Sequence, residues 1–288
     1  MLKRTITGAS IIALLLADVL WLRNYSIYFT DIAILVFAFF GAWEVFHSMK
    51  IGGYNMMEWA FFATMVVLYP LVLLFDSLGI MLAVFVGTII ALLQFTFSKK
   101  GYSLNDATAT IFATVYPMSF MSLFLLMNHG VGELVSIFLV LAISIFSDTF
   151  AYFVGVTVKG PKLCPTISPK KTISGAVGAV FGGMLGAVLI FLLFEYYNVL
   201  EGWPNLQMTR LFTNWKIALP VYLAIGAVCS ALTMVGDLSA SSIKRKMGIK
   251  DFGKIFPGHG GFMDRLDGIT FVAPAVYFAV ALIMKING

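Results

Sequence analysis

Charged residues are scarce in this sequence: Asp, Glu, Lys and Arg make up only 11% of its 288 residues, whereas 60% of the residues are hydrophobic and 27 are phenylalanine. A soluble domain is about a quarter charged and about half apolar. A chain with so few polar side chains cannot cover its surface against water. The composition excludes an ordinary soluble globular protein and predicts an integral membrane protein.

Cysteine and histidine are also rare, with two and three residues. Cys164 falls in a predicted loop and Cys229 in a predicted span, so we expect no disulfide. The sequence has no Walker A motif, no HExxH and no Cys/His cluster. ATPase, zinc protease and zinc finger interpretations therefore have no support. The net charge of +5 comes from basic residues between hydrophobic stretches, which indicates membrane loops and not a nucleic-acid partner.

Long hydrophobic runs, in contrast, are abundant. A membrane-spanning helix needs about 20 mostly apolar residues, and nine stretches qualify: 5–22, 29–48, 59–76, 78–96, 106–128, 134–156, 173–194, 215–236 and 268–285. The expected fold is all-α, a polytopic membrane protein with about nine transmembrane helices. The first stretch follows Lys3-Arg4, has no small-residue cleavage site and contains Asp18, so we expect it to be retained in the protein.

Lysine and arginine are unevenly shared between the two sides of these spans. The side that holds the N-terminus carries 15 basic residues and the other side carries 4. The excess predicts that the first side is cytoplasmic, with the N-terminus inside and the C-terminus outside. The short N-terminus suits a bacterial plasma membrane enzyme.

The polar residues that could perform chemistry lie mostly in the second half of the chain. We therefore expect residues 1–100 to form N-terminal helices (spans 1 to 4) and residues 101–288 to form the catalytic region. Span 7 differs from the polar blocks, because Gly178, Gly182 and Gly186 repeat at GxxxG spacing. This spacing permits close helix packing and indicates no chemistry.

Two polar blocks flank the loop before span 7. In "SDTFAYFVG" Asp148 interrupts an apolar helix, with Tyr152 one turn later. Asp148 either faces a polar cavity or reaches interfacial water. In "ISPKKTISG" Ser168, Lys170 and Lys171 come just before a helix start, where free N–H groups favour an anion. These lysines form either a phosphate site or an anchor for lipid headgroups.

Two further blocks follow span 8. "GDLSASSIKRK" places Asp237 at the membrane edge and Lys244-Arg245 two helical turns later. "KDFGKIFPGHGGFMDRLDG" carries Lys250, His259, Gly260, Gly261 and Arg265, and its Asp264 and Asp267 stand at i and i+3. Such an acid pair is often only a solvated helix face. Together, however, the four blocks supply carboxylates for Mg²⁺ and lysine, arginine and glycine for phosphates. This combination favours phosphoryl or nucleotidyl transfer at the membrane surface.

At these positions the sequence resembles the phosphatidate cytidylyltransferase (CDP-diacylglycerol synthase) family. The matching residues are Ser241, Ile243, Lys244, Arg245, Lys250, Asp251, Gly253, Phe256, Pro257, His259, Gly260, Gly261, Phe262, Asp264, Arg265, Leu266 and Asp267. "SDTFAYFVG" and "ISPKKT" resemble accompanying blocks of the family, so the resemblance covers about residues 140 to 285. One departure is Ser174, where the family usually has Glu or Gln.

The resemblance implies the reaction CTP + phosphatidate → CDP-diacylglycerol + pyrophosphate, with Mg²⁺ either alone or together with a second cation. It makes Asp237 and Asp264 the best candidates for cation ligands, followed by Asp267 and Asp148. By position, the expected catalytic residues are Asp237, Asp264, Lys244 and Arg245. The expected substrate contacts are Ser168, Lys170, Lys171, Lys250, His259, Gly260, Gly261 and Arg265. The resemblance also implies a possible homodimer.

Other functions remain open at this point. A CTP-dependent lipid or polyprenol kinase would use similar residues, and a CDP-archaeol synthase would perform the same reaction on an ether lipid. A membrane transporter would also explain the intramembrane acids Asp18, Glu44 and Asp148. Transporters, however, usually bind their substrate near the midplane, whereas these polar blocks gather at one face. The location favours an interfacial enzyme, and Glu44 could lie near the same site.

Overall fold

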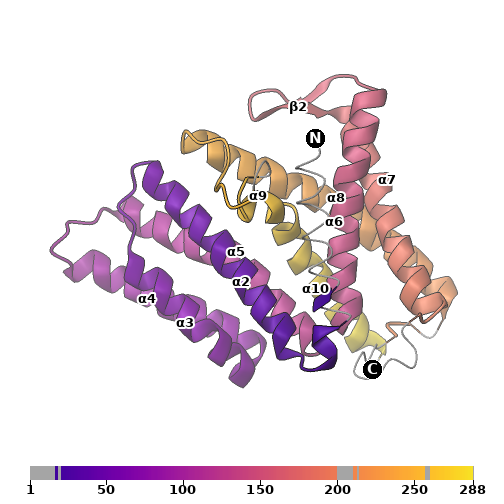
Figure 1. Ribbon diagram of the computed structural model, residues 1–288, viewed down its shortest axis with the longest axis horizontal. Helices are drawn as coiled ribbons and strands as arrows, with labels where there is room; N and C mark the ends of the chain where they lie inside the picture. Colours follow the sequence, from indigo (N-terminus) through magenta and orange to yellow (C-terminus); the bar gives the residue numbers. More distant parts are fainter. Residues whose placement is uncertain (1–16, 19–20, 200–209, 213, 257–259, 288) are drawn as a thin grey trace. The chain divides into compact units, whose positions relative to one another are not determined.

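The computed structural model describes residues 17–18, 21–199, 210–212, 214–256 and 260–287. Nearly all regular structure in these residues is helical (Figure 1). The elements are η1 (Leu22–Asn24), α2 (Tyr28–Ile51), α3 (Glu58–Phe75), α4 (Ser77–Phe97), α5 (Leu104–Asn128), α6 (Glu133–Thr157), β1 (Lys162–Cys164), β2 (Ser168–Thr172), α7 (Ile173–Ile190), the π-helical turn η2 (Phe191–Tyr196), α8 (Trp215–Lys246), α9 (Met263–Leu266) and α10 (Ile269–Asn287).

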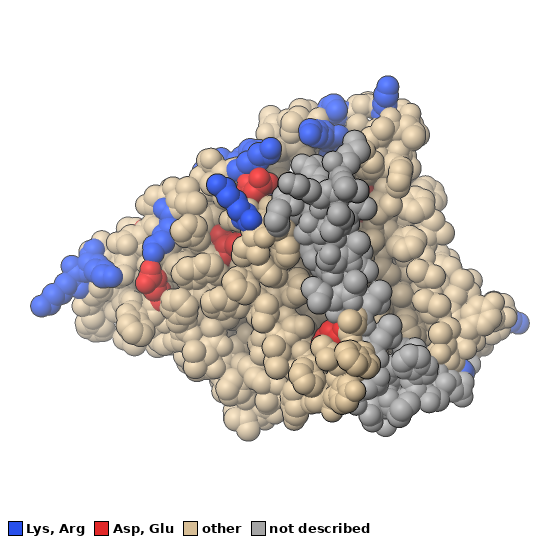
Figure 2. Space-filling model, in the orientation of Figure 1, with Lys and Arg blue, Asp and Glu red and all other residues tan. Residues whose placement is uncertain are grey.

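Eight of the described helices are long and apolar enough to cross a membrane, counting α7 and η2 as one. They match the eight expected spans that begin at residue 29 or later, so the all-α polytopic fold is confirmed. Most of the expected span 5–22 lies outside the described residues. Much of the described surface is neither acidic nor basic (Figure 2), as a protein that faces lipid requires.

The chain forms two compact units, each built from separate pieces of sequence. Among the pieces that the structure mostly describes, unit 1 contains residues 31–126 and 243–266. Unit 2 contains residues 17–30, 127–242 and 267–288. The sequence-based division at residue 100 stays a prediction. In unit 1, α3 and α4 form the tight hairpin expected from the short connection between them.

Close packing of α6 on α7 dominates unit 2. Gly178, Gly182 and Gly186 lie against α6, where an added Cβ would meet side-chain or backbone atoms of residues 142–154 at 3 Å or less. The expectation that these glycines permit close packing is therefore confirmed. The connection between the helices forms a small antiparallel hairpin, β1–β2, where the sequence predicted only a loop.

The C-terminal end of α8 extends beyond the expected span. The sequence predicted a helix to residue 236, whereas α8 continues to Lys246. Basic residues in the last turn favour the helix, because its C-terminus carries partial negative charge. Gly248 then ends it with a φ of +70°: the Gly248 amide bonds the Arg245 carbonyl at 3.2 Å, and the Ile249 amide bonds the Lys244 carbonyl at 2.9 Å.

Candidate active site

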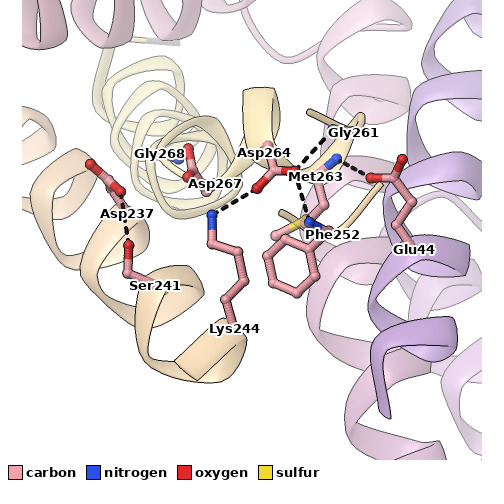
Figure 3. A network of polar contacts seen from close by, with 10 residues as sticks. All are labelled: Glu44, Asp237, Ser241, Lys244, Phe252, Gly261, Met263, Asp264, Asp267 and Gly268. Carbon is pink, nitrogen blue, oxygen red and sulfur yellow. Dashed lines mark hydrogen bonds and ion pairs between the residues drawn. The ribbon is translucent and has the colours of Figure 1, made fainter. Parts of the chain in front are cut away.

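The signature segment after α8 is folded around the carboxylate of Asp264. One oxygen, Oδ2, accepts hydrogen bonds from the Phe252 amide at 2.8 Å and the Gly261 amide at 2.9 Å. The other oxygen, Oδ1, accepts from Lys244 Nζ at 2.7 Å (Figure 3). Asp264 is only 9% exposed. Charge-assisted bonds of this kind are among the strongest in proteins, so Asp264 fixes both ends of the loop that precedes α9.

Lys244 joins this cluster from the last turns of α8. Its side chain is 12% exposed, and its ammonium group lies 5.2 Å from the centre of the Phe252 ring. A buried ion pair is tolerated only where good geometry offsets the loss of hydration, and the ring face adds a cation–π contact. The structure therefore brings together Lys244, Asp264 and Gly261, three of the residues predicted from the sequence.

Helix α2 packs on the same segment through one face. Phe37 and Phe40 contact the ring of Phe262. A Cβ added at Gly41 would lie 3.3 Å from the Leu266 side chain, so the two segments pack closely there. One turn later, Glu44 Oε2 accepts a hydrogen bond from the Met263 amide at 2.9 Å. Glu44 was the least certain acid in the sequence. The spacing of residues 37, 40, 41 and 44 at i, i+3, i+4 and i+7 is the signal that marks this shared face.

Asp237 and Lys171 form the corresponding pair in unit 2. Lys171 Nζ makes a short ion pair with Asp237 Oδ2, and their side chains are 26% and 30% exposed. Ser241, one turn further along α8, donates to Asp237 Oδ1 at 3.5 Å. The lysine comes from β2 and the aspartate from α8. Two of the four predicted blocks are thus in contact within this unit.

Asp267 and Asp148 also lie in unit 2. Asp267 Oδ1 accepts from the Gly268 amide at 2.9 Å, which stabilises the start of α10. Gly236 of α8 lies against the Asp267 carbonyl, where an added Cβ has no room. Asp148 has an exposed side chain on α6, as does Tyr152 one turn later.

The lysine-rich hairpin leads directly into α7. Thr172 caps the helix, since its side chain accepts from the Gly175 amide at 3.1 Å. Ser174, the departure from the family pattern, makes a short hydrogen bond to the Lys159 carbonyl and lies 3.1 Å from the Thr172 hydroxyl. It therefore ties the start of α7 to the turn that connects α6 to β1. Lys170 is exposed beside it, and Ser168 is partly buried.

The remaining predicted residues are three exposed basic side chains, one glycine with a positive φ, and one histidine outside the described residues. Arg245, Lys250 and Arg265 have exposed side chains, and Gly260 adopts a φ of +85° that favours glycine. A Cβ at Gly260 would lie 2.7 Å from Asp264 Oδ2. His259 and Pro257 lie outside the described residues.

The donor atoms fit a hard divalent cation. Asp264 and Asp237 each form an ion pair with a lysine ammonium group. Each carboxylate therefore already stabilises a positive charge at its position. Within the residues described, no group of three or more His, Cys, Asp or Glu side chains is arranged for a metal. Such a group is not required for Mg²⁺, which usually keeps waters and binds one or two carboxylates together with substrate phosphates.

The chain matches the cytidylyltransferase family over residues 2–283, which is more than the expected 140–285. A phosphatidate cytidylyltransferase of Thermotoga maritima is 29% identical over 225 residues, covering 77% of this chain and 78% of the relative. Proteins of the same name from Staphylococcus saprophyticus and Rickettsia felis are 35% and 40% identical, over 64% and 46% of this chain. The matches span 63% and 52% of those relatives. The chain belongs to the cytidylyltransferase family.

Proposed function

We propose that the protein is a phosphatidate cytidylyltransferase, which converts CTP and phosphatidate into CDP-diacylglycerol and pyrophosphate in phospholipid biosynthesis. The observation that carries the proposal is the cluster around Asp264, in which the signature segment is folded on a carboxylate paired with Lys244. Relatives with this activity in their names match most of the chain and support it. The kinase, archaeol and transporter alternatives have no comparable support.

In the proposed reaction an oxygen of the phosphatidate phosphate attacks the α-phosphorus of CTP, and pyrophosphate leaves. The attacking oxygen is already anionic, so no general base is needed. Catalysis then depends on positioning and on neutralising charge. Lys244, Arg245, Lys171 and Lys170 are the proposed phosphate contacts, with Lys250, Arg265 and His259 as further candidates. Ser168, Gly260 and Gly261 would let backbone and small side chains approach the phosphates.

We further propose that the enzyme depends on Mg²⁺, either alone or together with a second cation. The ligands would be one or two carboxylates of the set Asp237, Asp264, Asp267 and Asp148. When bound, the ion would neutralise the triphosphate and favour departure of pyrophosphate. Lys171 and Lys244 hold the carboxylates Asp237 and Asp264 in place before substrate arrives.

The protein crosses the membrane several times, and we propose that it resides in a bacterial plasma membrane with its active site facing the cytoplasm. The basic side of the spans supports this orientation, with the N-terminus inside and the C-terminus outside. A homodimer is part of the proposal.

The test is to follow the phosphorus atoms of CTP. Purified protein in phosphatidate-containing vesicles receives Mg²⁺ and CTP labelled at either the α- or the γ-phosphorus. The proposal expects α-label in the lipid and γ-label in pyrophosphate. In vesicles that also contain diacylglycerol, γ-label in the lipid would instead identify a kinase. Absence of CTP turnover with phosphatidate and with its ether-linked analogue would contradict both a phosphatidate cytidylyltransferase and a CDP-archaeol synthase.

A further inference from the structure

Glu44 is a buried acid inside a membrane-spanning helix, an unusual place for a charge. It is 4% exposed and lies in α2, more than 200 residues before the signature segment. Oε2 accepts the Met263 amide at 2.9 Å, whereas Oε1 is buried without a hydrogen-bond partner in the described residues (Figure 3). A buried acceptor without a partner costs stability. The carboxylate is thus buried with a backbone partner for Oε2 and, among the residues described, none for Oε1.

The signature segment leaves room for this carboxylate at two glycines. An added Cβ at Gly253 or Gly261 would overlap the carboxylate oxygens of Glu44. Neither glycine has a positive φ, so the backbone at these two positions does not itself require glycine. The close approach of the Glu44 carboxylate is what leaves no space for a side chain at these two positions.

Glu44 and Asp264 divide the backbone of this segment between them. Asp264 accepts the amides of Phe252 and Gly261, and Glu44 accepts the amide of Met263, the residue that directly precedes Asp264. Met263 is fully buried. The bond to Glu44 thus holds the first residue of α9, directly beside Asp264.

We propose that Glu44 is a positioning residue for the cytidylyl transfer, which holds the Met263 amide so that Asp264 is directed at the reacting phosphates. This inference rests on the proposed function. Glu44 itself touches neither substrate nor ion in this account. It acts through the backbone of residues 261–264.

Three substitutions separate positioning from simple structural support. Glu44→Gln keeps an oxygen that accepts the Met263 amide, Glu44→Met has a similar length without an acceptor, and Glu58→Gln is the control. Glu58 is also in unit 1 and forms an exposed ion pair with Lys50. We expect Glu44→Gln to keep kcat within about threefold, and Glu44→Met to lower kcat by about 10- to 100-fold, as for other residues that orient a ligand. The KM for CTP should change little.

A merely structural role predicts another pattern. Glu44→Met leaves the buried Met263 amide without its acceptor and should melt below Glu44→Gln. A structural role predicts that kcat falls only as far as the folded fraction falls, whereas positioning predicts that kcat per folded protein falls as well. If kcat of both variants instead followed the folded fraction, or if Glu44→Met had the kcat of the unchanged protein, the positioning role would be overturned.

A second measurement tests the contact without relying on turnover. Gly261→Ala should lower stability in the unchanged protein and lower it less in a Glu44→Ala background, where the carboxylate is gone. Gly130→Ala is the control, because its Cβ would meet nothing within 4 Å. Hydrogen exchange of the Met263 amide should rise in Glu44→Met and stay slow in Glu44→Gln. Additive alanine effects, together with unchanged exchange, would contradict the inference.

These two measurements also distinguish this inference from the proposed function. An unchanged protein that fails to use CTP refutes the proposed function, whereas the exchange and alanine results still report on Glu44. Normal CTP turnover with no effect of Glu44→Met refutes only the positioning role.

Discussion

The α6–α7 interface of unit 2 and the signature segment of unit 1 hold their backbones in place by opposite means. Between α6 and α7, glycines allow two helices to touch, and each helix satisfies its own backbone hydrogen bonds. The signature segment has little regular structure, so its amides need partners from elsewhere. Asp264 and Glu44 supply these partners. Two buried acids thus organise irregular backbone that has no helical hydrogen bonds of its own.

The largest expected effect comes from removing the charge that organises the signature segment. Asp264→Asn should lower CTP turnover by about a thousandfold, the loss typical of a group that stabilises transition-state charge. The amide oxygen of the introduced asparagine can still accept the Phe252 and Gly261 amides, so the protein should fold, with lower stability because Lys244 loses its carboxylate. Turnover and thermal melting of the purified variant are the measurements.

Asp106→Asn is the matched control for this change. Asp106 also accepts two amides of unit 1, those of Asn55 and Ser103 at 2.8 Å, but it caps α5 outside the signature. It should lose some stability and keep its activity. A near-normal rate for Asp264→Asn, or an equal loss in both variants, would remove Asp264 from the proposed machinery.

The α6–α7 interface should respond in stability instead of chemistry. Gly182→Leu adds a side chain where a Cβ already meets the Phe146 carbonyl at 2.5 Å. Overpacking of this kind costs about 1–3 kcal/mol, so the melting temperature should fall while the folded protein keeps its kcat. Val177→Leu, at a 53% exposed position of α7, is the control and should melt normally. Equal melting temperatures would show that the two helices can separate without cost.

A smaller effect is expected at the half-exposed ion pair of unit 2. Lys171→Met should raise the KM for CTP about tenfold, equivalent to about 1.4 kcal/mol, because a proposed phosphate contact is lost. Thermal stability should change little, since its ion pair with Asp237 is partly exposed. Lys99→Met, on an exposed loop outside the four blocks, provides the comparison. Equal KM values for the two variants would contradict a role of Lys171 in binding.

The smallest effect is expected at the exposed pair of Lys50 and Glu58. Their 2.6 Å contact is short, but the side chains are 42% and 52% exposed. Exposed pairs contribute about 0.2–1 kcal/mol, so Glu58→Gln should melt within a few degrees of the unchanged protein and turn over CTP normally. A clear loss of activity would show that this end of α3 takes part in the reaction.

Local patterns in the sequence predicted the spans and the packing glycines well. Hydropathy over about 20 residues is sufficient to locate helices such as α4 and α10. The extension of α8 to Lys246 was missed because hydropathy ends at the membrane, whereas the helix ends at Gly248. The β1–β2 hairpin is too short for a periodic signal.

Pairings within the site were harder to predict. The contacts of Lys244 with Asp264 and of Lys171 with Asp237 join residues 20 and 66 positions apart. The bond from Met263 to Glu44 joins residues 219 apart. A motif shows which residues take part, but only tertiary packing determines their partners. Glu44 was visible as an intramembrane acid, yet nothing in its local sequence identified Met263.

In the proposed reaction the protein transfers a cytidylyl group to a lipid phosphate. CTP consumption by the purified protein can be compared in vesicles that contain either phosphatidate or diacylglycerol. A phosphatidate cytidylyltransferase should form CDP-diacylglycerol and an equal amount of pyrophosphate with phosphatidate, and should consume no CTP with diacylglycerol. Formation of CDP and phosphatidate from diacylglycerol, with no CDP-lipid in the other vesicles, would contradict the proposed reaction.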